Sequence, residues 1–334
     1  MSHVLIAGVV ALLVSILLGP KFIAFLRRNE FGQHIREEGP EHHFTKQGTP
    51  TMGGLLILLA ASIAFLAFSE YKVPALTVLF VTLGCGAIGF LDDFIKLTHQ
   101  RSLGLSGRWK LILLGLITIG VSVAVRHQHI PTEVYVPGIG DIELSYAYYG
   151  LLFLVIAGAA NGVNLADGVD GLAAGTGIIA LFTFAAMNVI AWIRSGRPGH
   201  RFETKLDLAI VGAALIGALV GFLWYNAFPA DVFMGDTGSM AIGGALATFA
   251  IFTKTIFLLL LIGGIFVIEA LSVIIQVFSF KYLGRRVLLM APIHHHFEMK
   301  AWSDTKIMVR FWIVTGILCA AGFALYYRYF TGFR

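Results

Sequence analysis

The chain has 334 residues, of which 57% are hydrophobic and only 13% charged, whereas a soluble domain carries about 25% charged residues. With a mean hydropathy of +0.83, this composition excludes an ordinary soluble enzyme and indicates a protein surrounded by lipid. The net charge of +5 would suggest nucleic acid as a partner in a soluble protein. Because the basic residues lie mostly in short loops, we expect no nucleic acid, and instead membrane lipids and phosphorylated substrates as partners.

Apolar runs recur along the chain from Val4 to Phe330. A hydrocarbon core about 30 Å thick requires roughly 20 apolar residues for each helical crossing. The first run is too long for a signal-peptide core, so we expect it to be retained. We predict an all-α polytopic membrane protein, organised as one domain over residues 1–334. It has about ten spans, near residues 4–26, 52–69, 74–91, 109–126, 145–160, 172–193, 207–225, 239–252, 255–279 and 308–330.

The loops predict the orientation of these spans. An even number of spans puts both termini on one face. The loops after the first, third and ninth spans carry most of the basic residues, which favours a cytoplasmic location for those loops and an outer location for both termini. On the outer face, residues 131–144 alternate apolar and polar side chains around Pro137 and Gly138, a pattern that predicts a β-hairpin. Cys85 and Cys319 fall within apolar runs and are expected to be packing residues.

Two adjacent carboxylates, Asp92 and Asp93, close the third predicted span. The C-terminus of a helix already carries partial negative charge, so a cationic partner must meet these side chains. Lys96, one turn further along the same helix, would satisfy one carboxylate but hardly both. Taken alone, this pair fits a structural salt bridge and a functional site about equally well.

Polar residues also interrupt the chain after the fifth and seventh predicted spans. The first interruption carries Asn161, Asn164, Asp167 and Asp170, and the second carries Asn226, Asp231, Phe233 and Asp236. Helix capping explains one or two of these residues but not the whole set. Binding of a hard cation or of sugar hydroxyl groups stays open for the first group. In the second, glycines flank Asp236-Thr237 and would let backbone amides approach a phosphate, while Phe233 offers a flat surface for a base.

Three consecutive histidines, His294, His295 and His296, lie in the loop before the last predicted span. Consecutive side chains diverge in a helix and alternate in a strand, so the run is a poor zinc site. Imidazoles that donate hydrogen bonds to phosphate fit better, and the neighbouring Arg285 and Arg286 favour the same interpretation.

All four polar groups follow odd-numbered spans and are therefore predicted to share one face. Carboxylates combined with basic residues and glycines are typical of a divalent-metal site for phosphoryl transfer. The alternative from another functional class of membrane protein is an ion-coupled transporter. An acid within an apolar run, such as Glu269, often lies on an ion path. A transporter predicts polar groups at mid-membrane and on both faces.

In their order along the chain, these motifs resemble those of the polyprenyl-phosphate N-acetylhexosamine-1-phosphate transferase superfamily. The likeness covers nearly the whole chain. The full histidine run followed by Phe297-Glu298 resembles the muramoyl branch of this superfamily, and the branch that uses UDP-N-acetylglucosamine is the alternative. The matching segments are residues 46–54, 89–96, 161–172, 226–239 and 291–298.

The resemblance implies an enzyme that transfers phospho-MurNAc-pentapeptide from UDP-MurNAc-pentapeptide to undecaprenyl phosphate, giving lipid I and UMP in peptidoglycan biosynthesis. It further implies Mg²⁺ as cofactor and a homodimer. The implied location is the bacterial inner (cytoplasmic) membrane, with the active site at the cytoplasmic face.

The implied site leads to a hypothesis for the role of each residue. Asp236 binds Mg²⁺, and Asp92 orients or deprotonates the lipid phosphate while Asp93 supports the metal or Lys96. The rival mechanism is a covalent phospho-aspartate at Asp92 or Asp93. Phosphate oxygens are assigned to Lys46, Lys96, His294, His295 and His296. Other substrate contacts are assigned to Thr51, Asn161, Asn164, Asp167, Asp170, Asn226, Phe233 and Gln276.

Overall fold

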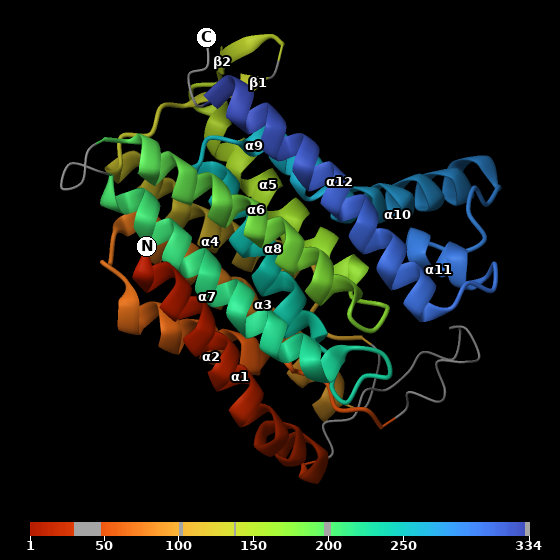
Figure 1. Cartoon of the computed structure of the whole chain (residues 1–334). Coiled ribbons are helices and arrows are strands. Elements are labelled where there is room, and N and C mark those ends of the chain that lie inside the picture. Colours follow the sequence, from red (N-terminus) through yellow and green to blue (C-terminus); the bar gives the residue numbers. More distant parts are fainter. Residues whose placement is uncertain (30–47, 100–102, 137, 197–201, 331–334) are drawn as a thin grey trace.

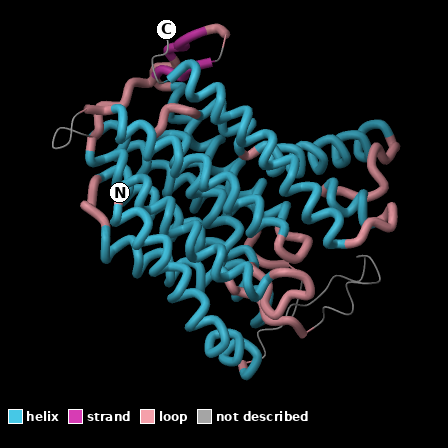
Figure 2. The backbone as a smooth tube through the Cα atoms, in the orientation of Figure 1, coloured by secondary structure: helices cyan, strands magenta, loops and turns pink. Residues whose placement is uncertain are grey.

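The computed structural model describes the whole chain except residues 30–47, 100–102, 137, 197–201 and 331–334. The described part is a bundle of helices with one two-stranded sheet (Figures 1 and 2). In chain order the elements are α1 Ser2–Arg28, α2 Gly54–Phe68, α3 Val73–Thr98, α4 Gly107–His127, β1 Glu133–Val136, β2 Gly140–Glu143, α5 Ala147–Ala166, α6 Leu172–Arg194, α7 Glu203–Asn226, α8 Gly235–Phe252, α9 Ile256–Ile262, α10 Gly264–Leu283, α11 Ile293–Glu298 and α12 Asp304–Phe330.

Eight of the described helices are long and apolar enough to cross a membrane, namely α1, α3, α4, α5, α6, α7, α10 and α12. A further apolar helix, α2, has 15 residues. The predicted all-α polytopic fold is therefore confirmed. Helix α8 occupies the eighth predicted span but is not among those eight helices.

The predicted span over residues 255–279 consists of two helices. Helix α9 ends at Ile262 and α10 begins at Gly264. At Gly264 a β-carbon would lie 2.6 Å from Leu318 Cδ1 on α12, so the glycine allows α12 to pack against the break. Beyond the break, α10 leaves the bundle and extends away from it (Figure 1). Hydropathy predicts one span here because the segments on both sides of the break are apolar.

Helix α8 lies inside the bundle. Every residue of this helix from Thr237 to Phe252 is buried, and its main neighbours are α3 and α5. Small residues allow these close contacts; a β-carbon at Gly243 would lie 2.3 Å from the carbonyl oxygen of Ala159 on α5. Because protein surrounds α8, its surface does not have to match lipid, and small or polar residues are tolerated along it.

The crossing of α3 and α8 positions the carboxylates that the sequence singled out. A β-carbon at Gly89 of α3 would lie only 2.1 Å from the carbonyl oxygen of Asp236. Any side chain at Gly89 would push the two helices apart, since this distance is far below van der Waals contact. The glycine therefore brings the end of α3, with Asp92 and Asp93, against the start of α8.

The predicted β-hairpin in residues 131–144 is confirmed. Strands β1 and β2 pair antiparallel, with Val134 opposite Ile142. The hairpin and the end of α12 lie at one end of the bundle, far from the loops that follow α3, α5 and α7 (Figure 1). Cys85 and Cys319 are free and buried, as expected of packing residues.

Candidate active site

Asp92 is 1% exposed and receives hydrogen-bond donors from three directions. The Nζ atoms of Lys96 and Lys110 lie 2.6 Å and 3.0 Å from its carboxylate oxygens. The backbone N–H of Leu105, in the loop before α4, donates to Oδ1 at 2.7 Å. Burial of an ionised carboxylate is costly unless it is paired and hydrogen-bonded, and this environment meets both conditions.

Asp93 is 4% exposed and caps the N-terminus of α8 from a different helix. Its Oδ1 accepts the backbone N–H of Asp236 at 3.1 Å. Its Oδ2 accepts the backbone N–H of Thr237 at 3.0 Å and the Thr237 hydroxyl at 2.7 Å. These amides have no partner within the helix, and the positive end of the helix dipole favours a carboxylate at this place. Asp93 therefore fixes the position of Asp236 relative to α3.

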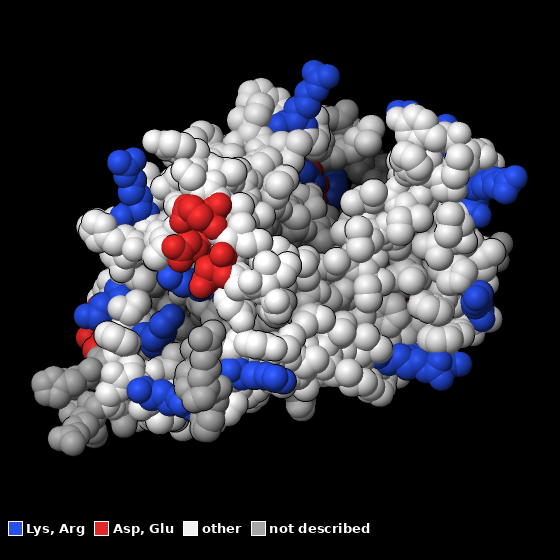
Figure 3. All heavy atoms as spheres, turned by 90° about the horizontal axis from the view of Figure 1, so that it is seen from above, with Lys and Arg blue, Asp and Glu red and all other residues white. Residues whose placement is uncertain are grey.

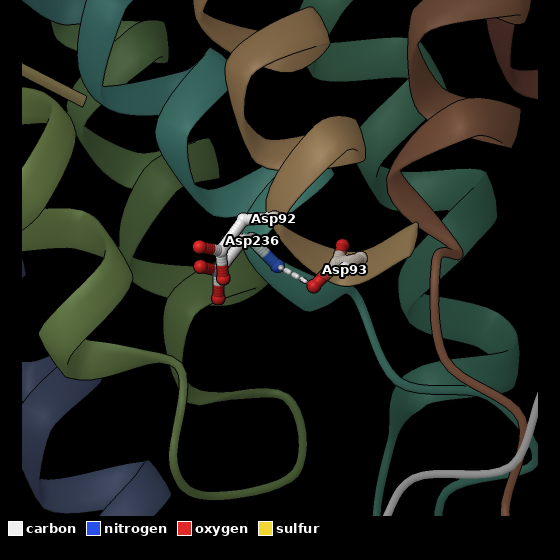
Figure 4. A group of neighbouring side chains, drawn as sticks. All are labelled: Asp92, Asp93 and Asp236. Carbon is white, nitrogen blue, oxygen red and sulfur yellow. Dashed lines mark hydrogen bonds between the residues drawn. The ribbon is translucent and has the colours of Figure 1, made fainter. Parts of the chain in front are cut away.

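Asp236 lies in the first turn of α8. Its Oδ2 is 3.2 Å from Lys96 Nζ and 3.0 Å from Lys110 Nζ. Asn164 at the end of α5 donates to Oδ1 at 2.8 Å and to the Ser239 hydroxyl at 3.0 Å. Figure 4 shows the carboxylates of Asp92 and Asp236 side by side, with Asp93 turned toward the backbone of α8.

Lys110 also belongs to this cluster, although no motif in the sequence singled it out. It lies at the start of α4 and, like Lys96, bridges Asp92 and Asp236. Spacing along the chain could not reveal this contact, since 126 positions separate Lys110 from Asp236. The two lysines place positive charge beside two neighbouring carboxylates, in a part of the protein that is partly shielded from water.

Asp92, Asp93 and Asp236 form a candidate metal centre among the described residues. One carboxylate oxygen from each lies within 4.8 Å of the others. Carboxylate oxygens are the ligands that hard divalent cations prefer. The donor set therefore fits such a cation, with Asp92 and Asp236 better oriented for it than Asp93, whose oxygens already bind the start of α8.

The polar residues at the end of α5 and just beyond it have three different partners. Asn164 contacts the carboxylate cluster, whereas Asn161 donates to Ala157 of its own helix at 2.8 Å. Asp167, just beyond α5, accepts the backbone N–H of Gly235. Burial and the nearby carboxylates of Asp236 and Asp93 raise the pKa of Asp167 well above its usual value. A protonated Asp167 could donate a hydrogen bond to a ligand.

Asp170 and Asn226 join the loops that follow α5 and α7. The backbone N–H of Ala230 donates to Asp170 Oδ2 at 3.1 Å. Asn226 accepts the backbone N–H of Gly171 at 3.1 Å and donates to the carbonyl of Val232 at 2.9 Å. Both side chains are buried, so they hold the two loops together at this edge of the cluster.

Thr51 and Phe233 lie where the segment before α2 pairs with the segment before α8. The backbone N–H of Phe233 donates to the carbonyl of Pro50 at 2.8 Å, and Gly53 N–H donates to the carbonyl of Phe233 at 2.9 Å. A β-carbon on Gly235 would lie 2.9 Å from Thr51 Oγ1 and 2.6 Å from Asp93 Oδ2. Thr51 is therefore adjacent to the cap of α8. Lys46, which we assign to phosphate, lies outside the described residues.

The histidine run forms the short helix α11, and each of its members has a defined partner. His294 Nδ1 lies 3.0 Å from Glu269 Oε1 on α10. His295 is hydrogen-bonded to Glu298, one turn along α11. His296 Nδ1 accepts the backbone N–H of Leu289 at 3.1 Å. Burial, with the charge of Lys300, lowers the pKa of His296 and favours its neutral form.

Gln276 on α10 supports the loop that leads to this run. Its amide oxygen accepts the backbone N–H groups of Val287 and Leu288 at 3.0 Å and 2.9 Å, and its amide nitrogen donates to the carbonyl of Leu288 at 3.0 Å. The side-chain amide thus pairs with the loop backbone as a neighbouring β-strand would. A direct contact between Gln276 and substrate stays a prediction, because loop backbone occupies the amide in this structure.

Comparison with known proteins identifies the class of membrane protein to which these features belong. The model of glycosyl transferase family 4 matches residues 75–254, which include the carboxylate cluster. A signature of phospho-N-acetylmuramoyl-pentapeptide-transferases matches residues 46–58. The fold and the cluster are thus those of a polytopic membrane transferase.

Full-length curated relatives show to which family of membrane transferases the chain belongs. The phospho-N-acetylmuramoyl-pentapeptide-transferase of Rubrobacter xylanophilus is 46% identical over 335 residues, covering 98% of each chain. The proteins of the same name from a Geobacillus species and from Bacillus subtilis are 48% and 46% identical, covering 94% and 93% of this chain and 95% and 94% of the relative. The chain belongs to the phospho-N-acetylmuramoyl-pentapeptide-transferase family.

Proposed function

We propose that this protein transfers phospho-MurNAc-pentapeptide from UDP-MurNAc-pentapeptide to undecaprenyl phosphate, giving lipid I and UMP in peptidoglycan biosynthesis. Full-length likeness to transferases of this name supports the proposal. The observation that carries it is the junction of α3, α4, α5 and α8, where two lysines and an asparagine meet the carboxylates of Asp92 and Asp236.

The reaction exchanges one phosphorus–oxygen bond for another. An oxygen of undecaprenyl phosphate attacks the sugar-linked phosphorus of UDP-MurNAc-pentapeptide, and the bond from that phosphorus to the bridging oxygen breaks. UMP leaves with the electron pair of the broken bond. The lipid phosphate has its second pKa at about 6 and is mostly a dianion at neutral pH, so it needs little help to become a nucleophile.

Lys96 and Lys110 are the proposed phosphate-binding cations. The carboxylates hold both ammonium groups in fixed positions before substrate arrives. Preorganised positive charge stabilises the negative charge that spreads over phosphoryl oxygens in the transition state. Asn164, which donates to Asp236 Oδ1, restrains the carboxylate from the opposite side.

Mg²⁺ is the proposed cofactor. Asp236 would hold it, with Asp92 as the neighbouring carboxylate, because these oxygens lie close together and belong to a partly water-shielded cluster. When bound, the cation offsets the negative charge of the pyrophosphate. Asp93 keeps α8, and with it Asp236, in register with α3.

The two mechanisms that the sequence left open make different demands on the paired aspartates. A phospho-aspartate at Asp93 would have to break three hydrogen bonds that hold the start of α8. These bonds argue against Asp93 as the nucleophile. We favour direct attack over a phospho-aspartate at Asp92 as well, with Asp92 orienting the lipid phosphate. A substrate that is chiral at the transferred phosphorus tests this mechanism. Inversion of configuration is expected, and retention would indicate a covalent intermediate.

The proposed location is the bacterial cytoplasmic membrane, with the carboxylate cluster at the cytoplasmic face and both termini outside. The basic loops after α1, α3 and α10 support this orientation. Periplasmic labelling of single cysteines introduced into the β1–β2 hairpin tests it. Labelling only after the membrane is permeabilised would reverse the orientation. The homodimer stays a prediction.

UMP release tests the proposed function. Purified protein in lipid nanodiscs is incubated with undecaprenyl phosphate, MgCl₂ and either UDP-MurNAc-pentapeptide or UDP-N-acetylglucosamine. UMP is expected only with the muramoyl substrate. Release only with UDP-N-acetylglucosamine would move the protein to the sister branch. Release with neither would leave the transporter as the stronger interpretation, although Glu269, which motivated it, is paired with His294.

A further inference from the structure

A buried acid–histidine pair joins α10 to α11. Glu269 is 0% exposed and His294 is 1% exposed, and Glu269 Oε1 lies 3.0 Å from His294 Nδ1. Glu269 was singled out in the sequence as an acid within an apolar run, and the roles argued above do not use it. An ionised carboxylate buried to this extent needs a compensating positive charge. In the described part of the chain, Glu269 forms an ion pair with His294.

The pair limits where the protons of the His294 ring can lie. If Glu269 is ionised, its carboxylate can only accept hydrogen bonds, and the proton of this contact is then carried by Nδ1. If His294 balances the charge of Glu269 as an imidazolium, Nε2 also carries a proton and is a donor. Among the described residues, neither His294 Nε2 nor Glu269 Oε2 has a hydrogen-bond partner, although both atoms are buried. Buried polar atoms without a partner are rare in native structures.

The direction of Nε2 connects this pair to the substrate loop. A β-carbon on Gly168 would lie 2.3 Å from His294 Nε2, so the ring contacts the backbone of the loop that follows α5. The same loop carries Asp167, which binds the backbone of Gly235 beside the carboxylate cluster. A proton on Nε2 therefore faces this loop, and a phosphate oxygen of the substrate can accept it only when the loop and the ring move apart.

We propose that Glu269 is a positioning residue that holds His294 with Nδ1–H donated to the carboxylate, so that Nε2–H is directed at a phosphate oxygen of the substrate. The inference rests on the proposed function for the identity of the phosphate. The groups that contact the His294 ring are the carboxylate of Glu269 on α10, the ring of His295 on α11 and the backbone of Gly168 in the loop after α5. Glu298 is engaged with His295, which leaves Glu269 as the direct partner of the His294 ring.

Two substitutions at Glu269 distinguish the effect of its charge from the effect of its size. Glu269→Gln preserves the size of the side chain and an acceptor for Nδ1–H, but removes the charge. Glu269→Asp preserves the charge but shortens the side chain by one methylene. If the residue only fills space between α10 and α11, the isosteric Gln variant should be the more active of the two. If it positions a charged His294, the Asp variant should be the more active.

We expect Glu269→Gln to lower kcat for UMP release about a hundredfold, with KM changed by less than about threefold because the contact is made to the transferred group. We expect Glu269→Asp to keep at least about tenfold more activity than Glu269→Gln. The matched control is Ser272→Ala, on the same helix. The Ser272 hydroxyl donates to the backbone carbonyl of Glu269 rather than to its carboxylate, so this variant should stay within about twofold of the parent. A Gln variant that is as active as the parent, or more active than Asp, would overturn the proposal.

A spectroscopic measurement tests the pair without any turnover. Solid-state NMR of full-length protein labelled with ¹⁵N-histidine reports the protonation of each imidazole nitrogen, and the His294 signals are assigned by their loss in His294→Gln. Both nitrogens should be protonated at neutral pH in the parent, and the ring should become neutral in Glu269→Gln. A neutral ring protonated only at Nε2 in the parent would refute the pair, even if UMP release is normal. Inactivity of the parent with an intact imidazolium would count against the proposed function alone.

Discussion

Two groups of three carboxylates lie at opposite ends of this molecule. On the hairpin, Glu133, Asp141 and Glu143 are exposed, and the register places Glu133 directly opposite Glu143. A group of acidic side chains is visible on the face of the molecule seen in Figure 3. At the other end, Asp92, Asp93 and Asp236 are withdrawn from solvent, and donors from four helices and the loop before α4 meet them.

This difference in burial and in partners shows that the number of acidic residues alone does not identify a functional site. On the hairpin, water screens the like charges, so their repulsion costs little and no lysine is needed. In the buried cluster, every carboxylate requires a partner, and the partners are specific atoms at specific distances. The arrangement needed to satisfy buried acids also holds cations where phosphate groups can meet them. Substitutions at the two ends should therefore differ sharply in their effects.

The largest effect is expected for Asp236→Asn. Loss of the charge removes the proposed metal ligand and the partner of two lysines, so UMP release should fall at least about a thousandfold. Asp141→Asn on the hairpin is the matched change and should leave the rate within about twofold. Equal activity of both variants would contradict the assignment of the site.

Lys110→Met should come next, with a loss of about a hundredfold in kcat/KM for UMP release. The ammonium group bridges Asp92 and Asp236, and its removal leaves buried negative charge less compensated. Lys72, between α2 and α3, provides the comparison because it donates to Asp207 through its backbone N–H. A Lys72→Met variant as impaired as Lys110→Met would argue for a general effect on folding.

Asp93→Asn should affect stability as well as rate. The amide nitrogen of asparagine would face backbone donors at the start of α8, so hydrogen bonds worth about 1.5–3 kcal/mol each to a charged acceptor are lost. We expect the unfolding midpoint in detergent to fall by about 5 °C. Glu133→Gln should leave the midpoint unchanged within error. An Asp93→Asn variant with unaltered thermal stability would show that the cap contributes nothing.

The smallest expected effect is a pH-dependent change in the stability of the β1–β2 hairpin. Hydrogen bonds from the Thr132 hydroxyl and the Ser145 N–H lower the pKa of Glu143 below 4.5. A depressed pKa in the folded state adds stability above the unfolded pKa, and that contribution is lost as pH falls through the folded pKa. Hydrogen exchange of the β1–β2 amides should be slightly faster in Glu143→Gln than in the parent at pH 7. The difference should shrink on acidification and disappear below the folded-state pKa of Glu143, and a difference that grew on acidification would contradict this linkage.

Local patterns in the sequence predicted much of the fold and the location of the site. The apolar runs gave the helices, the alternation in residues 131–144 gave the hairpin, and the odd-numbered loops brought Asp92, Asn164 and Asp236 to one end of the bundle. These features are predictable because hydropathy and loop parity are local properties of the chain.

Partners from distant parts of the chain could not be predicted. The lysine that bridges Asp92 and Asp236 comes from α4, and the role of Asp93 as a cap depends on how closely α3 crosses α8 at Gly89. The pairing of Glu269 with His294 depends on the break at Gly263 and on the path of the loop after α10. Each is set by packing between helices, which a single sequence does not encode in any short pattern.

The enclosed position of α8 has a consequence for the assembly of the protein in the membrane. A segment that begins Gly235-Asp236-Thr237-Gly238-Ser239 gains little from lipid on its own and is not among the helices apolar enough to insert alone. Its entry is therefore expected to depend on neighbours that are already in place, α3 and α5 among them. On this view the carboxylate cluster is completed only when the last of its helices joins the bundle, so the nascent protein remains inactive until that stage of its synthesis.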